Sequence, residues 1–147
     1  MNSLYTNNYS IINVYKKPSL KSEIVTQMIY GEGFKIITKS SKWLKIKIKE
    51  DGYKGFVQKK NFKPYIEPSH KVKILKTTIY RSHNTRHKVN ELTFGSKIKI
   101  IEKRLNFFKF EKGWIKHDSV EPISFKEKNP FSKISIFKDV KYKWGGK

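Results

Sequence analysis

Few side chains in this sequence are suited to covalent chemistry. Its 147 residues include four histidines but no cysteine, which excludes disulfides, cysteine-ligated metal sites and a thiol nucleophile within this sequence. No pair of histidine or acidic residues has the spacing of metal ligands, and no glycine-rich loop precedes an expected helix. We therefore expect neither a metal site nor a bound cofactor.

The charge of the chain is strongly positive. Lysine and arginine number 33 and aspartate and glutamate 12, which gives a formal net charge of +21. This balance makes polyanions the default partners. However, only Arg81, Arg86 and Arg104 are arginine, whereas phosphate-binding surfaces favour the planar guanidinium fork. The lysines also spread evenly instead of clustering, so we expect no nucleic-acid partner.

Two parts of the sequence are similar to each other. Residues 25–37 align with residues 89–101, so that Gly31 meets Gly95. The alignment continues on both sides of a gap of six residues, and pairs Trp43–Ile46 with Phe107–Phe110 and Gly55–Val57 with Gly113–Ile115. Such internal similarity predicts two copies of one structural unit.

Each copy has the pattern of short β-strands. Residues Lys45–Lys49 alternate lysine and isoleucine, which predicts a strand with one apolar face, and Glu50–Gly52 supplies the following turn. Four or five such strands in about 55 residues suit a small barrel. We therefore predict an all-β fold of two tandem barrels, joined near Ile66–His70. The aromatic residues expected in the barrel cores are Trp43, Phe56, Phe107 and Trp114.

The order of these segments resembles the bacterial Src-homology-3-like domain. That domain has a proline-containing first loop, a small-x-Gly turn, a paired apolar strand, a Trp-x-x-Val strand and a Gly-Trp-Val strand. The corresponding residues here are Tyr15–Ser19, Tyr30–Glu32, Ile36–Ile37, Trp43–Ile46 and Gly55–Val57. The second copy follows the pattern more weakly.

The last part of the chain does not fit the repeat. Ser132 is a candidate N-cap of a short helix, and residues 140–147 are similar to the Tyr-x-Trp-Gly-Gly motif of NlpC-type cysteine peptidases. The residue before Tyr142 is usually proline in that motif and is Lys141 here. The dipeptidyl-peptidase VI-like subfamily has two leading Src-homology-3-like domains. Its first-domain motifs have counterparts here at Glu23–Gln27, Gly31–Glu32 and Asp51–Gly55.

The resemblance divides the chain into three parts. Residues 1–66 and 67–124 are expected to be the two Src-homology-3-like domains. Residues 125–147 are expected to form a short helical and loop tail, the start of an α+β papain-like peptidase domain that is truncated before its catalytic cysteine. The four histidines all lie upstream of where that domain would place its catalytic histidine, so we expect them to be solvated or structural.

What the resemblance implies is a γ-D-glutamyl-L-diamino-acid endopeptidase that acts on cell-wall stem peptides, with a Cys-His pair oriented by a third polar residue. No catalytic residue falls in this chain, so we expect it to be inactive by itself. The resemblance places Glu23, Tyr53 and Tyr142 at the substrate end, where a carboxylate and hydroxyl groups would hold the free amino group of a muropeptide. The hairpin that carries Tyr53 is absent from the second copy, which supports a role for it.

Two other functions fit the sequence. One is a stand-alone interaction or wall-binding module, and the other, weaker one is a nucleic-acid-binding module. The N-terminal residues show no secretion signal and no stretch reaches the roughly 18 apolar residues of a membrane span, so we expect a cytoplasmic protein without a membrane partner. We also expect a monomer.

Overall fold

The computed structural model describes residues 4–83 and 87–123, and these residues form an all-β structure, as predicted. Within these ranges no α-helix occurs, and the one helical turn is the 3-10 segment His117–Ser119. The expected tail, residues 125–147 with Ser132 and Tyr142, lies outside the described residues. The chain divides into a first unit that ends at Ile66 and a second that begins at Glu67.

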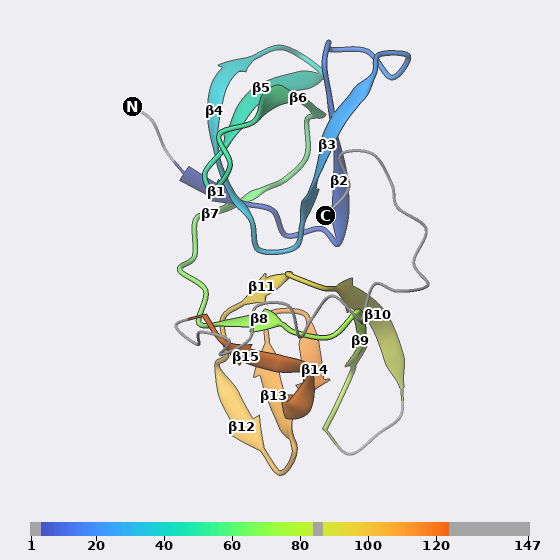
Figure 1. The fold of residues 1–147 in the computed structure, drawn as a ribbon, viewed down its shortest axis with the longest axis vertical. Coiled ribbons are helices and arrows are strands. Elements are labelled where there is room, and N and C mark those ends of the chain that lie inside the picture. Colours follow the sequence, from blue (N-terminus) through green and yellow to red (C-terminus); the bar gives the residue numbers. More distant parts are fainter. Residues whose placement is uncertain (1–3, 84–86, 124–147) are drawn as a thin grey trace, which may run out of the picture. The chain divides into compact units, whose positions relative to one another are not determined.

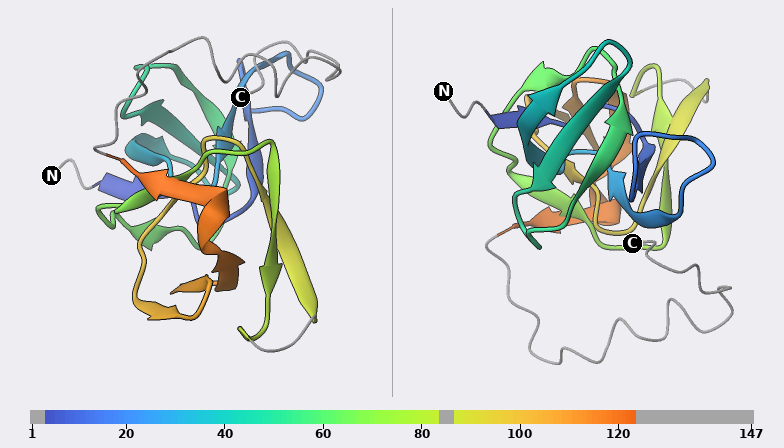
Figure 2. Two further views of the ribbon diagram at one scale, coloured as in Figure 1. Left: turned by 60° about the horizontal axis from the view of Figure 1, so that its bottom comes forward. Right: turned by 90° about the horizontal axis from the view of Figure 1, so that it is seen from above.

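The first unit is one curled antiparallel sheet with the strand order β3-β2-β6-β5-β4-β1-β7. Its strands, coloured blue to green, curve around a common interior (Figures 1 and 2). The side chains that fill this interior come from alternate positions, such as Leu44, Ile46 and Ile48 on one strand. The strands are β1 (Leu4–Thr6), β2 (Ile11–Tyr15), β3 (Ile24–Ile29), β4 (Gly33–Lys39), β5 (Trp43–Ile48), β6 (Lys54–Gln58) and β7 (Lys63–Pro64).

The second unit contains two antiparallel sheets, β10-β9-β14-β13-β12 and β11-β8-β15. Its buried core includes Ile79, Leu92, Phe110 and Ile115. Tyr80 on β9 pairs with Trp114 on β14, just as Tyr15 on β2 pairs with Phe56 on β6 in the first unit. The strands are β8 (His70–Val72), β9 (Lys76–Tyr80), β10 (Lys88–Thr93), β11 (Lys97–Ile98), β12 (Glu102–Arg104), β13 (Phe107–Phe110), β14 (Gly113–Lys116) and β15 (Val120–Pro122).

Strands β2 and β6 approach each other closely at Gly55. A Cβ atom on this residue would lie 2.5 Å from Val14 Cγ1 and 2.8 Å from the backbone oxygen of Tyr15. Gly113 has the same place in the second unit, where a Cβ atom would lie 2.5 Å from the backbone oxygen of Tyr80. The absence of a side chain is therefore what allows each of these strand pairs to form.

The expected position of the aromatic residues is only partly right. Trp114 is buried, with 7% of its surface exposed, but Trp43, Phe56 and Phe107 are only partly buried. In the first unit, Trp43 shares a strand face with Lys45, and the alternate residues Leu44 and Ile46 point into the core instead. The core is therefore mostly aliphatic, and Trp43 packs edge-on against Tyr15 outside it.

Candidate functional site

Glu23 lies at the end of the loop that joins β2 to β3. The loop is closed at its base by a hydrogen bond from the Lys16 backbone N–H to the Glu23 carbonyl oxygen, 2.8 Å long. A second bond, 2.9 Å long, runs from the Lys17 N–H to the Ser22 hydroxyl. Glu23 is exposed, and its carboxylate has no ion-pair or hydrogen-bond partner among the described residues. An ordered backbone thus presents a carboxylate that is available to a ligand.

Tyr53 lies in the turn between β5 and β6. The turn is closed by bonds from the Gly52 N–H to the Ile48 carbonyl, 3.0 Å, and from the Ile48 N–H to the Tyr53 carbonyl, 2.9 Å. Gly52 has φ +72°, which a side chain would disfavour, and the Tyr53 N–H donates to Asp51 Oδ1 at 3.1 Å. The Tyr53 side chain is 51% exposed and its hydroxyl has no hydrogen-bond partner in the described part of the chain.

Glu23 and Tyr53 therefore belong to the same unit, but no hydrogen bond joins them. Their strands meet at Tyr15, which pairs with Ile24 on one side and with Phe56 on the other. The third predicted residue, Tyr142, falls outside the described residues, so its position relative to the other two stays a prediction.

The second unit has neither feature at the matching positions. The Arg81 N–H donates to the His87 carbonyl at 2.9 Å, the same bond that Lys16 makes to Glu23, so His87 stands where the first unit has its carboxylate. The turn between β13 and β14 consists of residues 111–112, whereas residues 49–53 separate β5 from β6. Both candidate binding groups are thus particular to the first unit.

The motif Gly31–Glu32 forms a buried turn. Glu32 is 3% exposed and its Oε1 accepts a 2.9 Å hydrogen bond from the Ile29 N–H. The fully buried Asn7 closes the same turn, because its Nδ2 donates to the carbonyls of Met28 and Ile29. Burial also raises the pKa of the adjacent Tyr30 to about 12. Of the two glutamates in the three family motifs, Glu32 is therefore structural and Glu23 is accessible.

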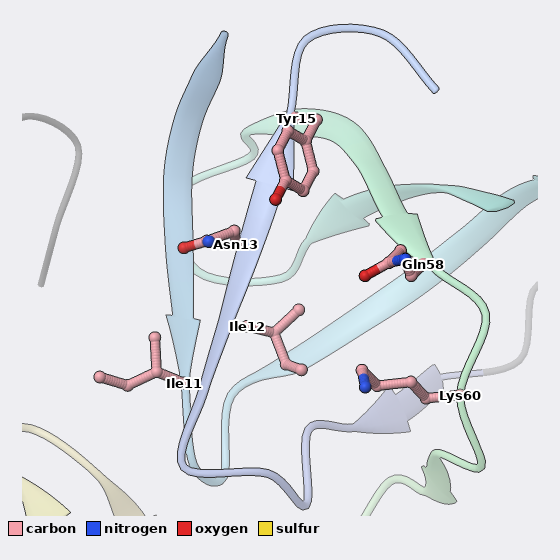
Figure 3. Close-up of a pocket in the computed structure, with 6 residues that line it drawn as sticks. All are labelled: Ile11, Ile12, Asn13, Tyr15, Gln58 and Lys60. Carbon is pink, nitrogen blue, oxygen red and sulfur yellow. The ribbon is translucent and has the colours of Figure 1, made fainter. Parts of the chain in front are cut away.

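A polar groove on the first unit was not predicted. It has a volume of about 200 Å³ and lies between β2 and the end of β6 together with the residues just after it. Figure 3 shows the hydroxyl of Tyr15, the amide of Gln58 and the ammonium group of Lys60 directed into this space. The alternation of residues in β2 could have indicated one wall of this groove, because it turns Ile11, Asn13 and Tyr15 outward. The other wall includes Gln58, which comes from a distant segment.

The described histidines make structural contacts or lie exposed. His70 Nδ1 lies 2.9 Å from the hydroxyl of Ser69, and its ring packs against Phe108. Burial, and to a lesser degree the charge of Lys103, lowers the pKa of His70. His83 packs against Trp114. Among the described residues, no group of three or more histidine or acidic side chains is arranged to hold a metal ion.

The comparisons with known proteins agree with this architecture. Residues 14–62 match the family model of the bacterial dipeptidyl-peptidase SH3 domain. The crystal structure of an NlpC/P60 family protein from Bacillus cereus has a TM-score of 0.78 with 14% identity, and the match covers 98% of this chain and 66% of that one. At this identity the likeness is one of fold.

Two further structures, NlpC2 and NlpC1 from Trichomonas vaginalis, match with TM-scores of 0.35 and 0.36 and identities of 12% and 11%. Each match covers 86% of this chain, and respectively 49% and 46% of those proteins. No curated protein sequence matches the chain. The chain thus spans between about half and two thirds of the length of these solved structures.

The all-β fold and the family match together show small β-domains, of which the first is SH3-like. More narrowly, residues 14–62 of the first unit are similar to the bacterial dipeptidyl-peptidase SH3 domain, and the fold resembles that of an NlpC/P60 family protein. In the described part of the chain, no helix is long and apolar enough to cross a membrane.

Proposed function

We propose that the first SH3-like domain selects peptide substrates with a free amino end for an NlpC-type peptidase. The substrates would be cell-wall stem peptides released during wall turnover and cleaved in the cytoplasm, at the bond between γ-D-glutamate and the diamino acid. Within the whole protein, the two barrels would form a duplicated pair that narrows access to the peptidase site.

The observation that carries this proposal is the carboxylate of Glu23, which is exposed and has no partner among the described residues. A carboxylate that already had a lysine partner would have to lose it before binding an ammonium group, and this cost is absent here. The adjacent loop is closed by backbone hydrogen bonds, so little additional ordering is required on binding.

Tyr53 supports the same function. Its hydroxyl can accept a hydrogen bond from an ammonium group without adding a competing cation. The residue that matches Glu23 in the second unit is His87, and the turn that matches the Tyr53 turn is shorter there. A free amino end would therefore bind to the first unit and not to the second.

A binding experiment on this chain tests the proposal. A stem tripeptide with a free amino end and its N-acetylated form are titrated separately into the labelled chain, and amide resonances are followed by NMR. The free-amine peptide should shift the resonances of residues 22–24 and 52–54, and Glu23→Gln should weaken its binding. Because Glu23 is exposed here, the expected loss is about 0.5 to 1 kcal/mol. In a complete peptidase that shields the Glu23 carboxylate and the bound ammonium group from water, the loss of binding free energy should rise to about 1.5 to 3 kcal/mol.

Glu102→Gln is the matched control, because it removes the same charge from the second unit, where the Glu102 carboxylate forms an ion pair of 3.5 Å with the exposed Arg104. This variant should bind the free-amine peptide as the unmodified chain does. Equal binding of the acetylated and free-amine peptides would show that Glu23 does not select the amino end. Equal losses of affinity for the free-amine peptide in the two variants would show the same.

A further inference from the structure

Lys60 provides a positive charge in the groove beside β2. Among the described residues, six line this groove: Ile11, Ile12, Asn13, Tyr15, Gln58 and Lys60. Within this set Lys60 carries the one formal charge, and no carboxylate contributes. In Figure 3 its ammonium group turns back toward β2.

Lys60 is held in place by an aromatic ring rather than by an acidic residue. Its Nζ lies 5.1 Å from the centre of the Tyr9 ring, a distance at which the ring face attracts the ammonium group. Tyr9 is fixed in turn by an edge-on contact with Phe62, and both rings pack against the core. Among the described residues, Lys60 has no carboxylate partner, so its charge can pair with a bound anion.

The other polar groups of the groove also have unused hydrogen-bonding capacity. Neither the Tyr15 hydroxyl nor the Gln58 amide makes a hydrogen bond to another described residue. Asn13 Oδ1 accepts a 2.8 Å bond from Gln27 Nε2, and the Asn13 amide hydrogens have no acceptor among the described residues. Ile11, which is 51% exposed, adds an apolar surface. Neutral polar groups and an apolar side chain beside one cation suit a short peptide better than a bare inorganic ion.

The corresponding place in the second unit has the opposite charge. Because Tyr15–Phe56 and Tyr80–Trp114 are matching pairs, the position of Lys60 corresponds to Asp118. Asp118 Oδ1 lies 2.9 Å from His117 Nε2. The two units therefore differ in charge at this position, which is basic in the first unit and acidic in the second.

We propose that the groove formed by Tyr15, Gln58 and Lys60 binds the free carboxylate end of a short peptide. Lys60 pairs with the carboxylate, the Tyr15 hydroxyl and Gln58 amide bind polar groups of the last peptide unit, and Ile11 contacts its side chain. The single lysine ammonium group, with no bidentate arginine guanidinium in the lining, matches an anion of one negative charge. The groove volume of about 200 Å³ suits one or two residues of a peptide. The inference does not depend on the function proposed for Glu23.

An NMR titration of the whole chain with N-acetyl-alanyl-alanine tests this inference. The acetyl group removes the amino end that Glu23 would bind, so failure here is distinct from failure of the amine-selection proposal. The acid form should shift the amide resonances of residues 11–15 and 58–60. The C-terminal amide of the same peptide should bind at least about tenfold more weakly, because it lacks the charge that Lys60 requires.

Lys60→Gln should weaken binding of the acid form by about tenfold. Lys59→Gln is the matched control, because it removes one exposed lysine charge from the adjacent position, and it should change binding by less than about twofold. The inference is overturned if the acid and amide peptides bind equally well, or if the two variants lose the same affinity for the acid peptide. It is also overturned if the shifted amide resonances belong to residues outside the groove. Equal binding of inorganic phosphate at the same resonances would also overturn it, because the groove would then not select a peptide carboxylate.

Discussion

Replacing Gly55 by alanine tests whether the close approach of β2 and β6 holds the first unit together. The new methyl group would lie 2.5 Å from Val14 Cγ1 and 2.8 Å from the Tyr15 carbonyl oxygen, well inside ordinary contact distances. Val14 is fully buried and the Tyr15 oxygen belongs to the backbone, so neither can move without disturbing the sheet.

The magnitude follows from the kind of contact. Overpacking of a well-packed interior costs about 1 to 3 kcal/mol, and a clash with backbone lies at the upper end of that range. Alanine recovers about 0.4 to 1 kcal/mol by restricting the unfolded chain. We therefore expect Gly55→Ala to lower the free energy of unfolding of the first unit by about 2 kcal/mol.

Urea unfolding followed by NMR separates the two units, because amide signals of β6 report on the first and those of β14 on the second. Gly52→Ala is the control. Gly52 has φ +72°, but a Cβ atom there would meet only Lys47 Cε at 3.9 Å, so the cost is backbone strain of about 1 to 2 kcal/mol, from which the same unfolded-chain gain of about 0.4 to 1 kcal/mol is subtracted. The reasoning would be refuted if Gly55→Ala lowered the free energy of unfolding of the first unit no more than Gly52→Ala does. It would also be refuted if Gly55→Ala lowered the free energy of unfolding of both units equally.

Two predictions concern pH. Burial raises the pKa of Tyr30 to about 12, so as the pH rises its phenol ionises first in the unfolded chain, and the first unit should lose stability above pH 10. Tyr30→Phe should lessen this loss by about 2 to 3 kcal/mol near pH 12, as measured by urea unfolding between pH 10 and 12. Burial, together with the charge of Lys103, lowers the pKa of His70, so the folded second unit resists protonation of this ring. The free energy of unfolding of the second unit should therefore fall as the pH drops below 6.5. His70→Asn should make this free energy less dependent on pH, and an unchanged slope would contradict the prediction.

The all-β class could be predicted because strand alternation is a local signal. The lysine and isoleucine alternation of residues 45–49 places Ile46 and Ile48 in the core. The same alternation places Trp43 on the outer face, but its size and apolar character favoured the core in the sequence interpretation. The strand β1 was also missed, because it forms through pairing with distant strands β4 and β7, for which three residues give little local pattern.

The candidate site shows the same division between local and distant information. The motifs located Glu23 and Tyr53, and the structure adds that both are exposed. Motif order alone could not distinguish an accessible carboxylate from the buried Glu32, whose role depends on its contact with Ile29. The groove at Lys60 requires two segments more than forty residues apart in the sequence, so no local pattern predicts it.

The first and last strands of the first unit are hydrogen-bonded neighbours. Tyr5 pairs with Pro64 and Thr6 with Lys63, so both ends of this module leave it at one place. A module whose ends are adjacent can be spliced into an exposed loop of a host protein without forcing the host backbone apart. Any such graft must keep Asn7, because its side-chain amide donates to the carbonyl oxygens of Met28 and Ile29, while its backbone carbonyl accepts the Gly31 N–H at 2.8 Å.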